Sequence, residues 1–316
     1  MSGDTPIPGL TSIVVVAADS GPLLSGCIRS VLASEAAVEV ILVDNASRDG
    51  EVERVAATHR NDARFRLLRN GVNLGFGPAC NRGAALASGD AFLFLNPDCD
   101  LRRDTIAAFR AAAGLDAGIG VLGANVLAPD GKPARGNRRR EPSLRRAMAS
   151  MTGLSRWEGR WPGLAGIEMP ASAISATSPV EFVEAISGAC IYMPRRAFER
   201  VGGFDEAYFL HAEDLDLCRR TRDAGLRVGI ANFATAVHAQ GSSSRRRCVF
   251  VARHKHRGMW RYFRKFDPAA ANPLLSALVW IGIWTHFALM LPAYAWRSWR
   301  ASRPARASVT SSAAPG

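Results

Sequence analysis

Short apolar runs alternate with helical patterns along the first 130 residues of the chain. Continuous apolar stretches predict strands at 12–17, 38–43, 65–68 and 91–95, because a strand covered on both faces loses the alternation of polar and apolar residues. Apolar residues at helical spacing predict helices between these runs, at 23–32, 52–57 and 78–87. A chain that alternates strand and helix in this way favours a parallel, doubly wound α/β unit.

The rest of the chain continues this pattern less regularly. Helices are predicted at 105–113, 195–201, from Glu213 onward and at 250–263, and strands at 120–127, 180–192, 227–231 and 235–237. Between residues 134 and 176 the pattern weakens. A loop of this length in a compact domain is usually functional or disordered.

Residues 274–296 form an almost wholly apolar stretch near the end of the chain. It is long enough to span a bilayer as a helix, and it carries aromatic residues towards both ends. Basic residues flank both sides, so the orientation stays open. The stretch predicts a spanning or in-plane membrane helix, with a buried core or oligomer helix as the alternative. The Ser-, Ala-, Pro- and Arg-rich tail at 301–316 is expected to be disordered.

The charge balance indicates an anionic partner. Lys and Arg number 40 against 28 Asp and Glu, a net charge of +12. This favours nucleic acid, a membrane surface or a phosphorylated substrate, but no nucleic-acid-binding module is visible. Arginines crowd the weakly patterned stretch at 135–146, ahead of Trp157 and Trp161. That stretch is either a solvated basic face or a loop that contacts anionic lipid or a lipid-linked phosphate.

Six widely spaced cysteines include no pair at zinc-site spacing, so reduced, cytoplasmic thiols are expected. Residues 1–10 lack a basic segment followed by an apolar core, and no secretory signal peptide is predicted.

Polar residues with catalytic potential follow the predicted strands or begin a helix. They are Asp44, Asp98, the pair Glu213-Asp214, and His238. Ligands of open α/β sheets lie at the carboxyl ends of strands. A carboxylate and a His there can hold Mg²⁺ or Mn²⁺ against a diphosphate, and another carboxylate can act as general base. The simpler alternative is that Asn96-Pro97-Asp98 is a turn, and that the other carboxylates only begin helices.

Other catalytic motifs are missing from the sequence. No GxGxxG follows the first strand and no GxxxxGK[ST] occurs, which argues against a dinucleotide-binding dehydrogenase and a P-loop nucleotidase. No GxSxG is present either.

Six motifs, in order over residues 12–244, carry a resemblance to a known family. They are Val43-Asp44-Asn45-Ala46-Ser47, Asn73-Leu74-Gly75-Phe76-Gly77 with Asn81-Arg82-Gly83, Leu95-Asn96-Pro97-Asp98, Ser187-Gly188-Ala189-Cys190, Gly202-Gly203-Phe204-Asp205-Glu206 and Glu213-Asp214-Leu215-Asp216-Leu217-Cys218. With them the chain resembles the family-two inverting glycosyltransferases, most closely the bacterial rhamnosyltransferase-like branch. The resemblance implies the GT-A fold, an α/β fold with a mostly parallel central sheet flanked by helices.

The resemblance also implies roles for individual residues. Asp44 is expected to contact the nucleobase of a nucleoside-diphosphate sugar, and Asn73 and Asn81 to shape the nucleotide pocket. Asp98 is the expected ligand of Mg²⁺ or Mn²⁺, and His238 matches a position that completes the metal site in some members. Asp214 resembles the general base that deprotonates the acceptor hydroxyl, with Glu213 supporting it. Direct attack on the anomeric carbon then inverts its configuration.

Two positions depart from the family pattern. The first strand ends in Ala17-Ala18-Asp19-Ser20 instead of a Tyr-Asn-Ser-like tip, which leaves Asp19 as the expected nucleotide-binding residue there. Asn96 replaces the first Asp of the metal motif. This should weaken metal binding, because a neutral amide attracts a cation less than a carboxylate does.

Together these observations predict a metal-dependent hexosyltransferase of cell-envelope glycan synthesis. Its donor would be a nucleoside-diphosphate sugar, rhamnose-like, and its acceptor a lipid-linked or polysaccharide glycan at the cytoplasmic face of the bacterial membrane. The alternatives are a sugar-1-phosphate nucleotidyltransferase and a non-catalytic, basic membrane-binding protein. The expected parts are a nucleotide-sugar-binding half (1–130), an acceptor-binding and catalytic half (131–268) with the basic loop 134–176, an apolar membrane-associated segment (269–300) and the tail (301–316).

Overall fold

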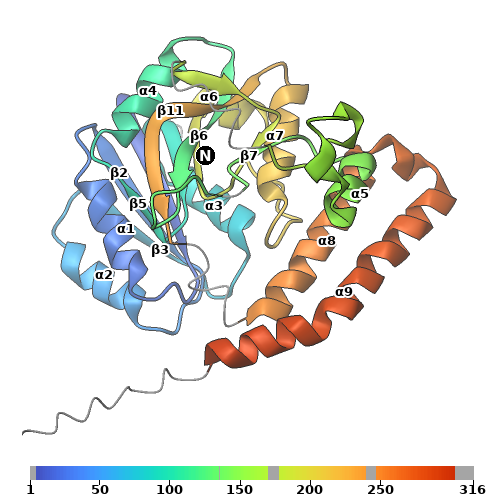
Figure 1. Ribbon diagram of the computed structural model, residues 1–316. Coiled ribbons are helices and arrows are strands. Elements are labelled where there is room, and N and C mark those ends of the chain that lie inside the picture. The colour runs from blue at the N-terminus through green and yellow to red at the C-terminus, as the bar shows by residue number, and fades with distance from the viewer. Residues whose placement is uncertain (1–4, 135, 170–177, 240–246, 303–316) are drawn as a thin grey trace, which may run out of the picture.

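A mixed β-sheet runs through the molecule, with helices on both of its faces (Figure 1). The computed structural model describes residues 5–134, 136–169, 178–239 and 247–302. Arg135, residues 170–176 of the predicted basic loop and residues 303–316 of the predicted tail lie outside this part.

The elements alternate along the chain as the apolar pattern predicts. The strands are β1 (Ile7–Ala17), β2 (Val38–Asp44), β3 (Phe65–Arg69), β4 (Gly89–Leu95), β5 (Cys99–Leu101), β6 (Ile119–Leu127), β7 (Arg138–Arg139), β8 (Val180–Phe182), β9 (Ala185–Ile186), β10 (Cys190–Pro194) and β11 (Arg227–His238). The α-helices are α1 (Leu23–Leu32), α2 (Glu51–His59), α3 (Phe76–Ala85), α4 (Thr105–Gly114), α5 (Leu144–Thr152), α6 (Arg195–Arg200), α7 (Glu213–Asp223), α8 (Cys248–Phe266) and α9 (Pro273–Ser302).

The main sheet has the order β3-β2-β1-β4-β10-β6-β11-β5, and β8 pairs with β11 beside this path. Strands β3, β2, β1 and β4 are parallel, as predicted. Beyond β4 the sheet changes: β10 is antiparallel to both of its neighbours, and β5 and β8 are antiparallel to β11. Most of the paired positions in the sheet are parallel, as predicted. The antiparallel strands make the sheet mixed, since β10 lies between β4 and β6 and runs opposite to both.

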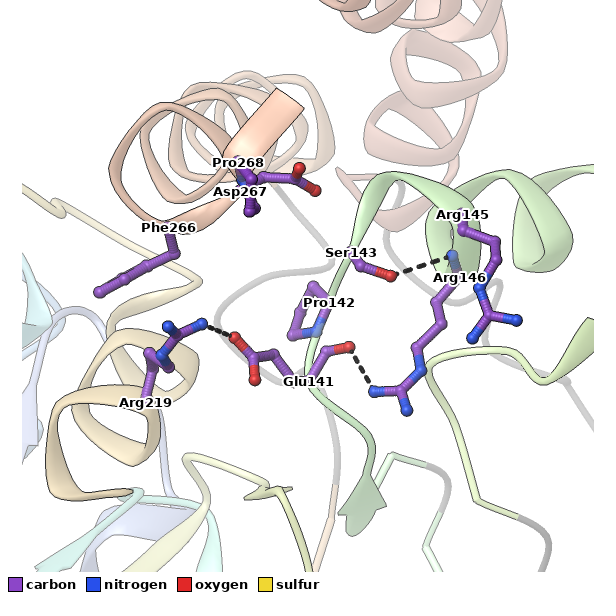
Figure 2. A pocket seen from close by; sticks show the side chains of 9 residues that line it. All are labelled: Glu141, Pro142, Ser143, Arg145, Arg146, Arg219, Phe266, Asp267 and Pro268. Carbon is purple, nitrogen blue, oxygen red and sulfur yellow. Dashed lines mark hydrogen bonds and ion pairs between the residues drawn. The ribbon is translucent and has the colours of Figure 1, made fainter. Parts of the chain in front are cut away.

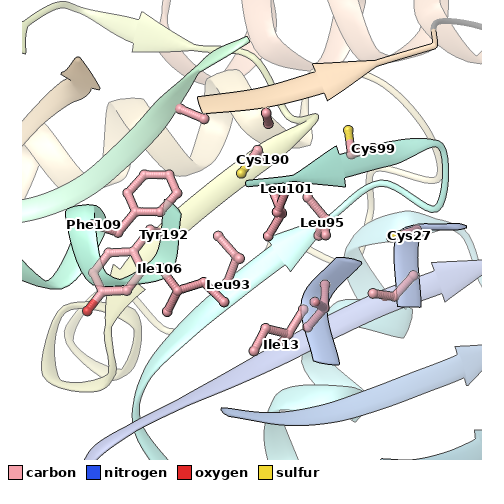
Figure 3. Packing of buried hydrophobic residues seen from close by; sticks show 14 of the residues in the cluster. Ile13, Cys27, Leu93, Leu95, Cys99, Leu101, Ile106, Phe109, Cys190 and Tyr192 are labelled. Atoms are coloured by element: carbon pink, nitrogen blue, oxygen red, sulfur yellow. The ribbon is translucent and has the colours of Figure 1, made fainter. Parts of the chain in front are cut away.

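Burial on both faces explains the continuous apolar runs. In β1, Ile13 and Val15 pack with α1, α2 and α4 on one face, while Val14 and Val16 pack with α3, α6 and α7 on the other. Figure 3 shows the first of these cores, where Leu93 and Leu95 of β4 lie near the stacked rings of Phe109 and Tyr192.

Two features of the far edge of the sheet were not predicted correctly. The strands expected at 227–231 and 235–237 form the single strand β11, with an irregularity between Ala231 and Thr235. Strand β5 was not predicted, because three residues are too short to show a periodic pattern. His238 consequently ends a strand that pairs with β5.

The weakly patterned stretch from residue 134 onward is partly ordered. It contains β7, α5 and two short 3-10 helices, Leu154–Trp157 and Pro162–Leu164. The Ser143 side chain caps α5 and Gly153 ends it in a left-handed conformation, as is typical of helix ends. Only Ala149 of α5 is buried, so the helix leaves almost no apolar periodicity in the sequence.

The chain ends in a helical hairpin formed by α8 and α9, which a short 3-10 helix, Pro268–Ala271, joins (Figure 1). Helix α9 is the one described helix long and apolar enough to cross a membrane, by length and composition. It continues to Ser302 and so includes the first two residues of the predicted tail.

Substitution of Gly83 tests the packing of α3 on the main sheet. A Cβ there would lie 2.5 Å from Val14 Cγ1 and 3.0 Å from Val43 Cγ2. We expect Gly83→Ala to lower the free energy of unfolding by about 1–3 kcal/mol, as overpacking does. Gly114→Ala, at the open end of α4, has no atom within 4 Å of the new Cβ and should leave stability unchanged or raised. Urea unfolding measures the free energy of unfolding of both variants. Equal changes in the two variants would contradict the close packing of Gly83 against Val14 and Val43.

Candidate functional site

Asp98 and His238 meet at the end of β4, although 140 positions separate them in the sequence. Strand β4 ends at Leu95, the chain turns through Asn96-Pro97-Asp98, and β5 then pairs with the end of β11 in the register Cys99 to His238. His238 Nε2 lies 3.0 Å from Asp98 Oδ1, and the two side chains are 15% and 8% exposed. The predicted pair is therefore brought together at one partly accessible point.

Asp98, Cys99 and His238 form a possible metal-binding cluster, with one ligand atom of each within 4.8 Å of the others. A carboxylate oxygen and an imidazole nitrogen fit a divalent cation whose remaining positions are filled by water and phosphate oxygens. Cys99 fits less well, because burial raises the pKa of its thiol well above the ordinary value and a metal ligand must be the thiolate. Asp98 and His238 are the better ligand pair.

Asn96-Pro97-Asp98 forms a hydrogen-bonded turn, as the simpler alternative predicts, and the metal site at Asp98 stays a prediction. The Cys99 amide donates to Asn96 O at 3.1 Å, and the Asn96 amide donates to Ala189 O at 2.9 Å. Asp100 lies elsewhere, against Gly26 of α1. The backbone of the turn thus directs Asp98, and not Asp100, towards His238.

Asp214 lies at the start of α7, as the sequence predicts for Glu213-Asp214. Asp214 Oδ2 accepts hydrogen bonds from the Gly188 amide at 3.0 Å and from Arg139 Nη1 at 3.1 Å. Gly188 has little room for a side chain, since a Cβ would lie 3.3 Å from Asp214 Oδ2. The carboxylate is held in one orientation, which is a requirement for a general base.

The segment 187–189 connects the two acidic groups. Its Gly188 amide binds Asp214, and its Ala189 carbonyl accepts from the Asn96 amide beside Asp98. The Ser187-Gly188-Ala189-Cys190 motif therefore forms a bridge between the turn that carries Asp98 and α7.

Glu213 is buried beside Asp214 and has an unusual carboxyl group. Burial, followed by the neighbouring Asp214 carboxylate, raises the pKa of Glu213 to about 8. Among the described residues, none hydrogen-bonds to Glu213 Oε2. The protonated form of Glu213 is therefore favoured at neutral pH.

The backbone immediately before α7 is strained. His211 and Ala212 have φ values of 67° and 71°, which side chains other than glycine rarely adopt. Gly258 of α8 permits this arrangement, because a Cβ there would lie 2.6 Å from His211 O. Strain of this kind is typical of functional sites.

Asp44 ends β2 and is engaged by two partners. Its Oδ1 accepts from the Ser47 amide at 2.9 Å, and its Oδ2 pairs with Arg69 Nη1 at 3.0 Å. Arg69 also binds Glu53. Asp44 thus organises the turn after β2, and its contact with a nucleobase stays a prediction.

Asn73 holds the glycine-rich turn in place. Its Oδ1 accepts from the Asn45 side chain at 2.8 Å and from the Gly75 amide at 2.9 Å. Gly75 lies so close to Phe209 O that a Cβ would be 2.4 Å from it. The turn therefore packs against the segment that leads into α7.

Asn81 joins two of the motifs. Its side-chain amide donates to Phe204 O at 2.9 Å and to Glu206 Oε1 at 3.0 Å, and its Oδ1 accepts from the Phe204 amide. The Asn81 amide is used by the 202–206 segment, and its role towards a nucleotide stays a prediction.

Asp19 lies at the tip of β1 with a φ of 55°. It accepts from the Arg48 amide at 2.7 Å and pairs with Arg247 Nη2 at 2.7 Å. Arg247 directly precedes α8, so Asp19 links the first strand tip to the C-terminal hairpin.

Arg139 is the site residue that sequence reasoning missed. It belongs to the arginine-rich stretch, and only its position on β7, paired with β9, brings it to Asp214. Its neighbours Arg138 and Arg140 bind Glu181 and Glu158 instead. No feature of the sequence separates Arg139 from these neighbours.

A hollow separate from the candidate site lies where the α8–α9 hairpin joins the rest of the molecule (Figure 2). It has a volume of about 260 Å³ and is lined by residues of α5, α7 and the end of α8. Its arginines are already paired, Arg219 with Glu141 and Arg146 with Glu184. It contains none of the predicted site residues and serves as a structural junction.

Comparisons with known proteins identify the family and the fold. The model of the family described as "Glycosyl transferase family 2" matches residues 12–169. The chain is 32% identical, over 272 residues, to the N-acetylglucosaminyl-diphospho-decaprenol L-rhamnosyltransferase of Mycobacterium tuberculosis (strain CDC 1551 / Oshkosh), covering 79% of this chain and 86% of that protein.

Solved structures with the same fold include two proteins of low sequence identity. One is the mannosyltransferase PcManGT from Pyrobaculum calidifontis in complex with GDP-Man and Mn²⁺, with a TM-score of 0.54, 19% identity, and 93% of this chain and 76% of that chain covered. The other is GalNAc-T7 with UDP, GalNAc and Mn²⁺, with a TM-score of 0.58, 15% identity and 81% of this chain covered. This chain spans 47% of the latter. At these identities the likeness shows the fold, which is the predicted GT-A fold.

The protonated state of Glu213 predicts a pH dependence of stability. The folded protein keeps a proton on Glu213 up to a pH of about 8, whereas the unfolded chain releases it near the ordinary value of 4.5. The contribution of Glu213 to the free energy of unfolding therefore falls as the pH rises between these values. Glu213→Gln cannot ionise, so the Tm of the wild type should fall relative to that of the variant across this window. Parallel Tm curves for the two proteins would contradict the assignment.

Proposed function

The chain belongs to glycosyl transferase family 2, and from this premise we propose that it transfers a rhamnose-like sugar from a nucleoside-diphosphate sugar to a lipid-linked or polysaccharide acceptor. The observation that carries the proposal is the connection of Asp98 and His238 to Asp214 through segment 187–189. Adjacent backbone groups of this segment connect two parts of the site. One part is a ligand pair suited to a diphosphate-bound cation, and the other is an oriented carboxylate. A cell-envelope glycan is the proposed product.

Asp214 is the proposed general base. One of its carboxylate oxygens takes the proton of the acceptor hydroxyl while the hydroxyl oxygen attacks the anomeric carbon. The bond from that carbon to the diphosphate breaks, and the electron pair leaves with the nucleoside diphosphate. Attack from the side opposite the leaving group inverts the anomeric configuration. Arg139 and the Gly188 amide keep the carboxylate in position during this step.

Asp98 and His238 are the residues that would hold a divalent cation, Mg²⁺ or Mn²⁺. Such a cation supplies Lewis acidity that neutralises charge on the diphosphate. Asn96 cannot add a carboxylate, and His238 takes its place as the second protein ligand. Asp44, Asn73 and Asp19 are proposed to form the nucleotide end of the site, since they lie at or behind the tips of β1 and β2. Asn81 of α3 is proposed to support this end through its bonds to Phe204 and Glu206.

The acceptor is proposed to be membrane-bound and used at the cytoplasmic face. The support for this is the lipid diphosphate in the name of the mycobacterial relative and the long apolar helix α9. A sugar-1-phosphate nucleotidyltransferase has no support from family membership, and a non-catalytic membrane-binding protein would not depend on Asp214.

Asp214→Asn tests both the reaction and the base. With a panel of nucleotide sugars and a lipid-linked acceptor, we expect the wild type to transfer one sugar and the variant to lose ~10²–10⁴-fold in kcat. Asp223→Asn is the matched control, because it makes the same change at the exposed end of the same helix. Near-normal rates in Asp214→Asn would rule out the base assignment. The absence of transfer from every nucleotide sugar would rule out the proposed activity.

Metal binding can be measured without turnover. We expect Asp98→Asn and His238→Ala each to lower the affinity for Mn²⁺ by at least about tenfold, in a titration followed by electron paramagnetic resonance. Asp100→Asn removes the same charge two residues away and should have little effect. If Asp100→Asn weakens binding as much as Asp98→Asn, the assigned ligand is wrong.

A further inference from the structure

Helix α9 presents an apolar outer face that no described part of the chain covers. One side of the helix packs on α8, at positions that include Ser276, Val279, Ile283 and His286. The opposite side is exposed and apolar along the whole length. Its exposed members are Leu274, Leu278, Ile281, Leu289, Trp296 and Trp299, and Trp280 and Leu291 are exposed on its flank. An apolar surface of this length marks an interaction site.

Contacts at both ends and in the middle hold α9 along α8. Ser276 Oγ donates to Ala270 O at 2.9 Å near the corner of the hairpin. His256 Nε2 lies 3.0 Å from His286 Nδ1 at its centre. The Cys248 amide donates to Ser298 Oγ at 3.0 Å near the other end. The two helices are therefore antiparallel neighbours over the length of α8, as Figure 1 also shows.

Helix α8 cannot follow α9 into a bilayer. It carries six basic residues in its interior and last turns, namely Arg253, Lys255, Arg257, Arg261, Arg264 and Lys265. Charged side chains are costly at the centre of a bilayer. As long as α9 stays packed on α8, it cannot span the membrane.

The catalytic domain holds α8 firmly. Arg261 Nη2 pairs with Asp205 at 2.9 Å, and Lys265 Nζ bridges Asp205 and Asp216 at 2.7 and 2.6 Å. Asp267, just after α8, accepts from the Leu144 amide at the start of α5 at 2.8 Å. The hairpin is thus an integral part of the domain and not a separate anchor.

We infer that the α8–α9 hairpin docks in the plane of an anionic lipid bilayer, with the outer face of α9 in the interfacial region and no residue crossing to the other side. Helix α9 is apolar around most of its circumference, and the basic helix α8 lies along one side of it. The hairpin as a unit therefore has one apolar and one basic side, as in-plane amphipathic helices do. Exposed Arg253, Lys255 and Arg257 on α8, and Arg297 and Arg300 at the end of α9, complement anionic headgroups. The net charge of +12 also favours binding to an anionic bilayer.

Helix α5 and the turn after it lie beside the corner of the hairpin (Figure 1) and carry exposed apolar side chains. These side chains form a second apolar patch, namely Met148, Met151, Leu154, Trp157 and Trp161, each 44–57% exposed. The hydrogen bond between Leu144 and Asp267 ties this patch to the hairpin. We assign it to the same bilayer surface, as a second contact that limits rotation of the docked domain about α9.

The inference deepens the proposed membrane location. It rests on the proposed function only for the statement that the acceptor is bound in a membrane. Its test contains no sugar donor, so a failure to dock and a failure to transfer are separate results. The full-length protein is sedimented with vesicles of phosphatidylcholine alone, or of phosphatidylcholine mixed with phosphatidylglycerol. We expect binding to the mixed vesicles that weakens with added salt.

Ile281→Ser combined with Leu289→Ser removes two exposed side chains from the outer face, 53% and 75% exposed. We expect at least about tenfold weaker vesicle binding, as loss of two buried apolar groups implies. Leu115→Ser with Phe233→Ser is the matched control, because these side chains are 62% and 59% exposed on another part of the molecule. Equal binding by both double variants would overturn the docking surface. The docking surface would also be overturned if light scattering showed that Ile281→Ser with Leu289→Ser loses dimers while its vesicle binding is unchanged. The outer face of α9 would then pair with a second copy of the chain.

The in-plane orientation is tested by labelling both ends of α9. Ala271→Cys and Arg300→Cys are made singly in a Cys248→Ser background, because the other five cysteines are buried. A membrane-impermeant maleimide is added outside vesicles to which the protein has been bound. Labelling of both positions without detergent supports an in-plane helix. Protection of Arg300→Cys until detergent is added would show that α9 spans the bilayer and would overturn the inference.

Discussion

The pairing of β5 with the end of β11 is the constraint on which the candidate site depends. It brings His238 to Asp98 in a fixed register, with Cys99 opposite His238. A shift of one residue would turn His238 to the other face of the sheet, because strand side chains alternate. The short strand is stabilised by its surroundings: Cys99 is buried, and the Leu101 amide donates to Ser30 Oγ of α1.

The acidic start of α7 shows how the fold manages several carboxyl groups in a small volume. The Asp214 carboxylate accepts hydrogen bonds from Arg139 and from a backbone amide, and the Asp216 carboxylate pairs with Arg220 and Lys265. Burial raises the pKa of Glu213 and favours its protonated form. Three neighbouring acidic residues therefore have three different environments. Only Asp214 combines an ion pair with contact to the bridge that leads to Asp98, which is why it stands out as the base although the sequence offers three candidates in one motif.

Much of the fold and part of the site could be predicted from the sequence. Strands buried on both faces leave continuous apolar runs, and Asp98 follows one of these runs directly, so its position was evident. His238 could be proposed as a candidate because it follows a predicted strand, but its contact with Asp98 could not be predicted from the pattern, because its partner strand has three residues and gives no periodic signal. Arg139 could not be distinguished from Arg138 and Arg140, since the difference arises from the two-residue pairing of β7 with β9. The antiparallel direction of β10 was not predicted, because nothing in its sequence shows the direction in which it runs.

The same acidic motifs that build the site also fix the hairpin. Burial raises the pKa of Asp205, but hydrogen bonds from Lys265 and Arg261 outweigh this effect and lower it to about 2. Asp205 therefore stays ionised at every physiological pH and keeps α8 in place. Through Lys265, α8 also contacts Asp216, two residues beyond Asp214 on α7. The direction in which the Asp214 carboxylate faces is thus set relative to the outer surface of α9. A bilayer docked on that surface would meet the candidate site at one constant angle, which suits an acceptor that cannot leave the membrane.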